Sequence, residues 1–84
     1  MNQDEITKII FQLLKKIAPE TEPSALLPEE NIREALNIDS FDSLQFLVSL
    51  DEKLGIEIPE QDYGKTNTLK NLVEYIMSRM KIIK

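Results

Sequence analysis

Three stretches of the chain carry apolar residues at the spacing of an α-helix, and no stretch sustains the alternation typical of a β-strand. The first stretch runs from Asn2 to Ala18, the second from Ser40 to Leu54 and the third from Thr68 to Met80. Asn2 and Glu5 have the spacing of a capping box, and Gly55 follows the second stretch as a C-cap glycine does. The pattern predicts an all-α fold.

The segments between these helices are irregular but contain apolar residues. Glu20 to Asp39 is predicted to be a long loop because prolines interrupt it, and Pro28 to Leu36 is expected to hold a short helical turn. Five apolar residues are expected to pin this loop to a core: Leu26, Leu27, Ile32, Leu36 and Ile38. Glu60 to Gly64 is predicted to form one further turn, closed by Gly64. The prediction is a single domain over residues 1–84, a small four-helix bundle with three long helices, one short helix, and a long loop between the first and second helices.

Composition excludes most catalytic chemistry. The chain has no Cys and no His, which removes thiol nucleophiles, disulfides, zinc thiolates and the commonest general base. Two glycines cannot form a phosphate-binding loop, and the acids lack the spacing of a calcium loop. Paired acids such as Asp39 and Asp42 are better explained as helix-start residues favoured by the helix dipole. We therefore expect no catalytic residues, no metal site and no enzyme activity.

The net charge of the chain limits the kinds of partner that it can bind. Lys and Arg number 10 against 15 Asp and Glu, for a formal net charge of -5. An acidic domain repels nucleic acids and anionic membranes and favours basic surfaces of other proteins. No apolar run approaches the roughly 20 residues of a membrane span, and the first residues are acidic where a signal peptide is basic. The expectation is a cytoplasmic monomer that binds neither nucleic acid nor membrane.

The segment Asn-Ile-Asp-Ser-Phe-Asp-Ser-Leu, residues 37–44, resembles acyl carrier proteins. That family opens its second helix with Asp-Ser-Leu, continues with a Gly-Ile-Glu-Ile-Pro-like link and a short helix, and then has a Thr-capped last helix. Here Asp39-Ser40-Phe41 is followed by Gly55-Ile56-Glu57-Ile58-Pro59 and later by Thr68-Leu69. The order and spacing of these pieces, over almost the whole chain, carry the resemblance.

The resemblance implies a covalent cofactor on Ser40. In the family, a separate phosphopantetheinyl transferase uses coenzyme A and magnesium to esterify this serine with 4′-phosphopantetheine. Acyl or aminoacyl groups then travel as thioesters on the thiol of the arm, to loading and transferring enzymes of fatty-acid, polyketide or related biosynthesis, so the protein itself needs no Cys. Ser43 competes for the role. Ser40 is preferred because its interval to Glu57-Ile58-Pro59 fits the family and because the helix start favours a phosphodiester.

The same resemblance implies that the second helix docks onto basic patches of partner enzymes. The acids available for this are Asp39, Asp42, Asp51 and Glu52, and an ordinary solvated face is the alternative for each. The helix also carries an unusually wide apolar arc. We expect most of the residues in this arc to form core together with residues of the last helix: Leu44, Phe46, Leu47, Val48, Leu72 and Ile76. The alternative is that they line a cleft that shelters the cargo.

Four positions depart from the pattern of fatty-acid carriers. Asn37 stands where they commonly have glycine, and Asn tolerates the left-handed backbone that glycine supplies. Phe41 replaces a leucine, while Gln45 and Lys53 replace acids frequent there. A specialised carrier with dedicated partners is therefore as well supported as a housekeeping role. The alternative function is a helical protein-interaction module in which Ser40 is only a helix cap.

Overall fold

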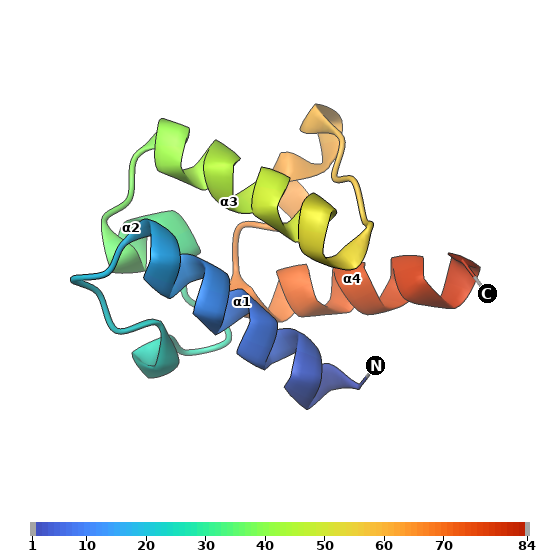
Figure 1. Ribbon diagram of the computed structural model, residues 1–84, viewed down its shortest axis with the longest axis horizontal. Helices are drawn as coiled ribbons and strands as arrows, with labels where there is room; N and C mark the ends of the chain where they lie inside the picture. The colour runs from blue at the N-terminus through green and yellow to red at the C-terminus, as the bar shows by residue number, and fades with distance from the viewer. Residues whose placement is uncertain (1, 84) are drawn as a thin grey trace.

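The computed structural model describes residues 2–83 and confirms the all-α prediction (Figure 1). Three helices are long: α1 (Gln3–Ile17), α3 (Ser40–Leu54) and α4 (Leu69–Ile83). A short helix, α2 (Ile32–Leu36), and a 3-10 helix, η1 (Pro23–Ala25), lie in the loop between α1 and α3. A second 3-10 helix, η2 (Glu60–Lys65), precedes α4. The part of the chain that is described contains an isolated bridge between Asn31 and Thr68 but no strand.

The core forms where α1 packs against α3 and α4 (Figure 1). The inward face of α1 buries Ile6, Ile10 and Leu14 completely, because their spacing places them on one side of the helix. The other long helices contribute Phe46, Leu50, Leu69, Leu72, Val73 and Ile76 to the same cluster. This burial of apolar surface is the main stabilising contribution in a chain of this size.

Local capping defines the ends of the long helices. The Asn2 side chain accepts a 2.9 Å hydrogen bond from the Glu5 N–H, and the Glu5 carboxylate accepts one of 3.0 Å from the Asn2 N–H. Gly55 ends α3 in the left-handed conformation at φ 69°. The Thr68 hydroxyl oxygen accepts a 3.1 Å bond from the Asn71 N–H at the start of α4. These three predicted caps are confirmed, and α4 continues past Met80 to Ile83.

The loop between α1 and α3 is tied to the start of α4 by backbone hydrogen bonds. The Ile32 N–H donates to the Asn67 carbonyl at 2.8 Å, and the Lys70 N–H donates to the Pro28 carbonyl at 2.9 Å. Leu26, Ile32, Leu36 and Ile38 are buried as predicted. The prediction for Leu27 is wrong, since it is 61% exposed. Leu26 has an extended backbone, in which neighbouring side chains point to opposite sides, so only one of the two leucines can face the core.

The short helical turn predicted within Pro28 to Leu36 is present as α2, whereas the second predicted turn differs in part from expectation. α2 starts at Ile32 because the Asn31 side chain caps it by accepting a 3.0 Å bond from the Glu34 N–H. The short helix after Pro59 is a 3-10 helix that runs through Lys65. Gly64 does not close it, because its backbone stays out of the left-handed region. The turn is instead closed by the Thr66 N–H, which donates to the Tyr63 carbonyl at 3.2 Å.

No helix within residues 2–83 is both long and apolar enough to cross a lipid bilayer.

Candidate functional site

The start of α3 presents Ser40 at the surface. Asp39, not Ser40, occupies the N-cap position, and its carboxylate accepts a 2.8 Å hydrogen bond from the Asp42 N–H. Ser40 is the first residue of the helix and is exposed. The alternative in which Ser40 is only a helix cap is therefore wrong, because Asp39 performs that function. The Ser40 hydroxyl group is free of any structural hydrogen bond to the described residues.

Ser43, the competing serine, lies in a different environment. It is half-buried one turn inside α3, and its N–H donates a 2.9 Å hydrogen bond to the Asp39 carbonyl. Ser40 and Ser43 line the same cleft, so location alone does not separate them. Exposure does separate them, because Ser40 is exposed and Ser43 is half-buried.

The turn before α3 is held from two sides. Asn37 ends α2 in the left-handed conformation at φ 54° and ψ 44°, so the backbone geometry expected at this position is present. The Ile38 side chain is buried, and its N–H donates a 3.1 Å bond to the Arg33 carbonyl. This anchored turn determines where Asp39 and Ser40 lie relative to the core.

A cleft of about 970 Å³ opens beside Ser40, between α2, α3 and η2. Ile32, Ile38 and Phe46 belong to the buried core and form its apolar floor. Leu44 and Leu47 of α3 and Tyr63 of η2 line it as well. This cleft differs from the one considered from the sequence, because Leu44, Phe46 and Leu47 line it but Leu72 and Ile76 of α4 do not.

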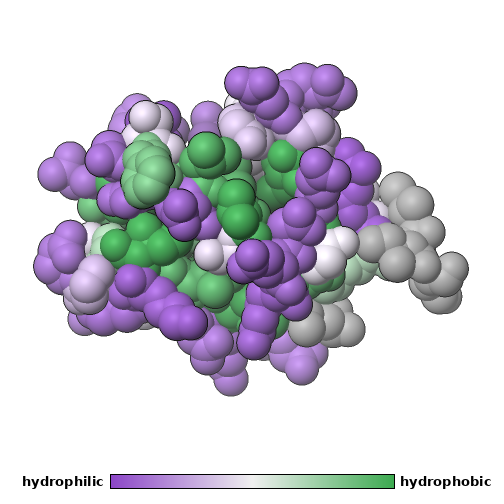
Figure 2. Space-filling view, turned by 45° about the horizontal axis from the view of Figure 1, so that its top comes forward, coloured by the Kyte–Doolittle hydropathy of each residue, from purple (hydrophilic) through white to green (hydrophobic). Residues whose placement is uncertain are grey.

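One face of α3 exposes apolar side chains to solvent. Phe41 is 66% exposed, and Leu44 and Val48 are each 48% exposed. Their spacing of three and four residues places them on one face of the helix; they are called the apolar stripe below. Figure 2 turns the α3 side forward and shows hydrophobic side chains gathered there with hydrophilic ones around them.

The core prediction for the apolar arc of α3 is therefore correct only in part. Phe46 is buried and Leu47 is half-buried, whereas Leu44 and Val48 are not core. Leu72 and Ile76 of α4 are fully buried, as expected. The width of the apolar arc was the sequence signal that could have revealed the stripe, because α1 and the neighbouring segments cover only one side of α3.

The four acids proposed for partner binding are not equivalent. Asp51 and Glu52 are exposed one turn beyond Val48, at the C-terminal end of the apolar stripe. Asp39 is exposed at the opposite end of the helix, roughly 18 Å away at 1.5 Å per residue. Asp42 is half-buried. The structure thus places two acids together beside the stripe and separates them from the two near Ser40.

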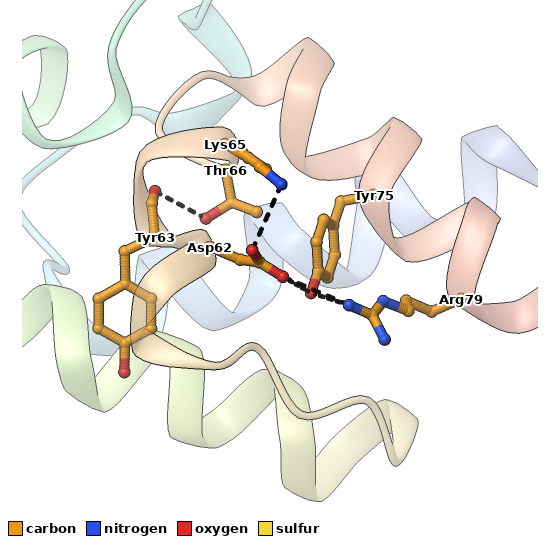
Figure 3. A network of polar contacts seen from close by, with 6 residues as sticks. All are labelled: Asp62, Tyr63, Lys65, Thr66, Tyr75 and Arg79. Atoms are coloured by element: carbon orange, nitrogen blue, oxygen red, sulfur yellow. Dashed lines mark hydrogen bonds and ion pairs between the residues drawn. The ribbon is translucent and has the colours of Figure 1, made fainter.

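A polar network on η2 was not foreseen from the sequence (Figure 3). Asp62 is only 8% exposed, and its carboxylate accepts a 2.7 Å hydrogen bond from the Tyr75 hydroxyl and one of 3.3 Å from Arg79. Lys65 lies 3.5 Å from the other carboxylate oxygen, and the Arg79 guanidinium group stacks over the Tyr75 ring at 4.8 Å. The network ties η2, which forms one wall of the cleft, to α4.

This network also shifts the ionisation of two groups. The hydrogen bond from Tyr75 holds the pKa of Asp62 below its ordinary value, against the opposing effect of burial, and Lys65 and Arg79 lower it further. Burial raises the pKa of the Tyr75 hydroxyl, and the bond to Asp62 raises it further. Asp62 is therefore an anion at neutral pH, and Tyr75 is its neutral donor.

The exposed serine at the start of α3, the cleft beside it and the apolar stripe agree with the arrangement expected from the resemblance to carrier proteins. Residues 6–76 match the family described as the phosphopantetheine attachment site. The chain is 31% identical over 80 residues to the acyl carrier protein of Thermosynechococcus vestitus. This alignment covers 95% of this chain and 98% of that protein. The chain therefore belongs to the acyl carrier protein family.

Two further comparisons agree with this assignment. The meromycolate extension acyl carrier protein of Mycobacterium tuberculosis is 30% identical over 90% of this chain, which spans 65% of that protein. The solved structure of the acyl carrier protein from Enterococcus faecalis superposes with a TM-score of 0.70 at 29% identity, covering 93% of this chain and 98% of that one. The protein is an acyl carrier in fatty-acid or related biosynthesis, with covalently attached 4′-phosphopantetheine as its cofactor.

Proposed function

We propose that Ser40 is the residue to which the phosphopantetheine arm is attached. The observation that carries this proposal is that Ser40 is exposed at the first position of α3 while Asp39 performs the capping. The N–H groups of the first helical turn and the positive end of the helix dipole favour a phosphodiester at this point. The adjoining cleft is large enough to receive an arm that starts from Ser40.

The attachment reaction requires only a hydroxyl group from this chain. The Ser40 oxygen forms a bond to the phosphorus that bears pantetheine in coenzyme A, and the pyrophosphate bond breaks. Adenosine 3′,5′-bisphosphate leaves, and the serine proton passes to a base on the transferase. The bound arm supplies a thiol for thioester formation, so this chain positions the cargo and its partner enzymes perform the catalysis.

We further propose that the apolar stripe and the acids beside it form the surface for partner enzymes. Phe41, Leu44 and Val48 can enter an apolar depression of a partner, and Asp51 and Glu52 can meet a basic rim. Exposed charges of this kind accelerate association, whereas the buried apolar centre of an interface supplies more of the affinity. Asp39 and Asp42 lie next to Ser40, so they would add negative charge to the end of this surface that is close to the attachment point.

Intact mass measurement tests the attachment site. The protein is incubated with coenzyme A, magnesium and a broad-specificity phosphopantetheinyl transferase, with Ser40→Ala and Ser43→Ala beside it. We expect one phosphopantetheine on the wild type and on Ser43→Ala, and none on Ser40→Ala. Loss of the addition in Ser43→Ala alone would reassign the site to the inner serine, and addition to all three proteins would exclude both.

The docking surface is tested with the same transferase as the partner. The double variant Asp51→Asn, Glu52→Gln should lower kcat/KM at low salt and show a weaker salt dependence than the wild type. Gln12→Ala, on the exposed side of α1, serves as the control and should leave both values unchanged. An unchanged salt dependence in the double variant would exclude these two acids from the interface.

Three broader expectations complete the proposal. The chain acts as a single carrier domain, as a monomer, and in the cytoplasm. Sedimentation of the purified protein tests the first two, and a tagged copy followed through cell fractionation tests the third.

A further inference from the structure

The cleft beside Ser40 has a mixed chemical lining. Its floor is apolar, but exposed polar side chains surround the floor, among them Asn37, Asn67, Glu34 and Glu60. A long saturated chain laid against these groups would displace water from them without replacing its hydrogen bonds. Such a lining favours a ligand that has polar atoms of its own.

Tyr63 is the aromatic residue of this lining that carries a hydrogen-bonding group. It is half-buried on η2, and it packs against the buried core. Figure 3 shows its ring pointing away from α4, on the side opposite to the carboxylate of Asp62. Its hydroxyl group makes no hydrogen bond to any residue that the structure describes, so it is available as both donor and acceptor.

The position of Tyr63 depends on the neighbouring residue. Asp62 accepts hydrogen bonds from Tyr75 at 2.7 Å and from Arg79 at 3.3 Å, which hold η2 against α4. Because Tyr63 follows Asp62 directly, this anchor also determines where the phenol group of Tyr63 lies in the cleft. A binding group that is positioned before its ligand arrives loses little entropy on binding.

We propose that the cleft accepts a short acyl group that bears an oxygen or nitrogen substituent, and that the Tyr63 hydroxyl group hydrogen-bonds this substituent. The inference rests on the proposed attachment of the arm to Ser40, which lines the same cleft as Tyr63. Tyr63 is then a specificity-determining residue for the cargo. Asp62, Tyr75 and Arg79 are positioning residues that act through η2.

The test compares three cargoes on the same carrier. Butyryl, 3-hydroxybutyryl and octanoyl groups are loaded with their arms from the matching coenzyme A thioesters, and mass spectrometry confirms the load on Ser40. The rate at which hydroxylamine cleaves the thioester is then measured for each loaded carrier, and it is divided by the rate for the same acyl group on free coenzyme A. We expect the 3-hydroxybutyryl group to be protected about fivefold more than the other two, the size of one modest hydrogen bond. In Tyr63→Phe this preference should disappear.

Ser43→Ala is the matched control, since it removes another hydroxyl group from the lining of the same cleft. It should retain the fivefold preference. Equal protection of all three cargoes in the wild type, stronger protection of octanoyl, or an unchanged preference in Tyr63→Phe would each overturn the inference. Nuclear magnetic resonance of the wild type gives a second readout, in which the Tyr63 ring signals should shift with 3-hydroxybutyryl and not with butyryl.

Failure of the cargo proposal can be distinguished from failure of the proposed attachment site. A carrier that takes the arm on Ser40 but shows no cargo preference contradicts only the assignment of the cleft. A carrier that does not take the arm on Ser40 contradicts the proposed function as well.

Discussion

The Tyr75 hydroxyl group donates a 2.7 Å hydrogen bond to the buried carboxylate of Asp62 and so joins η2 to α4 across thirteen positions of sequence. Arg79 reinforces the contact by donating to the same carboxylate oxygen at 3.3 Å and to the Tyr75 oxygen at 2.6 Å. One wall of the cleft is therefore held by charge and hydrogen bonding, whereas its floor is held by apolar packing. The stability of the wall should therefore depend on pH, whereas the stability of the floor should not.

Asp62 should stabilise the fold at neutral pH and lose this effect in acid. Since its pKa is lowered in the folded state, its contribution is present above the ordinary aspartate value of about 3.9 and is lost as the pH falls through the lower folded value. Urea unfolding of the wild type and of Asp62→Asn at neutral and acidic pH measures this. The difference in stability between them should be larger at neutral pH, and equal differences at both would contradict the role of Asp62.

Asp39 should contribute more to stability than Ser40 does. Asp39→Ala removes the acceptor for the Asp42 N–H and should lower the free energy of unfolding by about 1 kcal/mol, whereas Asp39→Asn keeps an acceptor oxygen and should lose less. Ser40→Ala should stay within about 0.5 kcal/mol of the wild type, because the hydroxyl has no structural partner. Urea titration of the four apo-proteins checks this order, and a larger loss for Ser40→Ala would reverse the assignment of the cap.

Leu44 and Leu50 should respond differently to the same substitution. Leu50→Ala leaves a cavity in the core and should cost about 2–5 kcal/mol, because Leu50 is only 1% exposed. Leu44→Ala should change stability by less than about 0.5 kcal/mol, since the side chain already contacts water. Leu44→Ala should instead raise KM with the transferase. A comparable loss of stability in both variants would place Leu44 in the core and remove it from the docking surface.

Asn37 should tolerate glycine better than alanine. Its left-handed backbone costs an ordinary side chain about 1–2 kcal/mol, a penalty that glycine does not have. Asn37→Gly should therefore unfold at about the wild-type temperature, while Asn37→Ala should be destabilised by about 1 kcal/mol. Differential scanning calorimetry separates the two, and an unaffected alanine variant would show that the turn can adopt another conformation.

The sequence determined those features whose causes lie within a few residues. Asn2, Gly55 and Thr68 cap their helices through contacts of three or four positions, so their roles follow from local spacing. The order of Asp39, Ser40 and the later Ile-Pro link was also sufficient to suggest a carrier and its serine. These features depend on the chain alone.

Only the tertiary structure decided which side of an apolar segment is covered. Leu44, Val48 and Leu27 are as apolar as their buried neighbours, and their exposure follows from where α1 and the neighbouring segments stop covering the surface. The burial of Asp62 likewise depends on Tyr75 and Arg79, which lie on a different helix. A residue's own chemistry sets its preference for water or for the core, but burial is shared among elements distant in sequence, so only their packing shows which preferences are met.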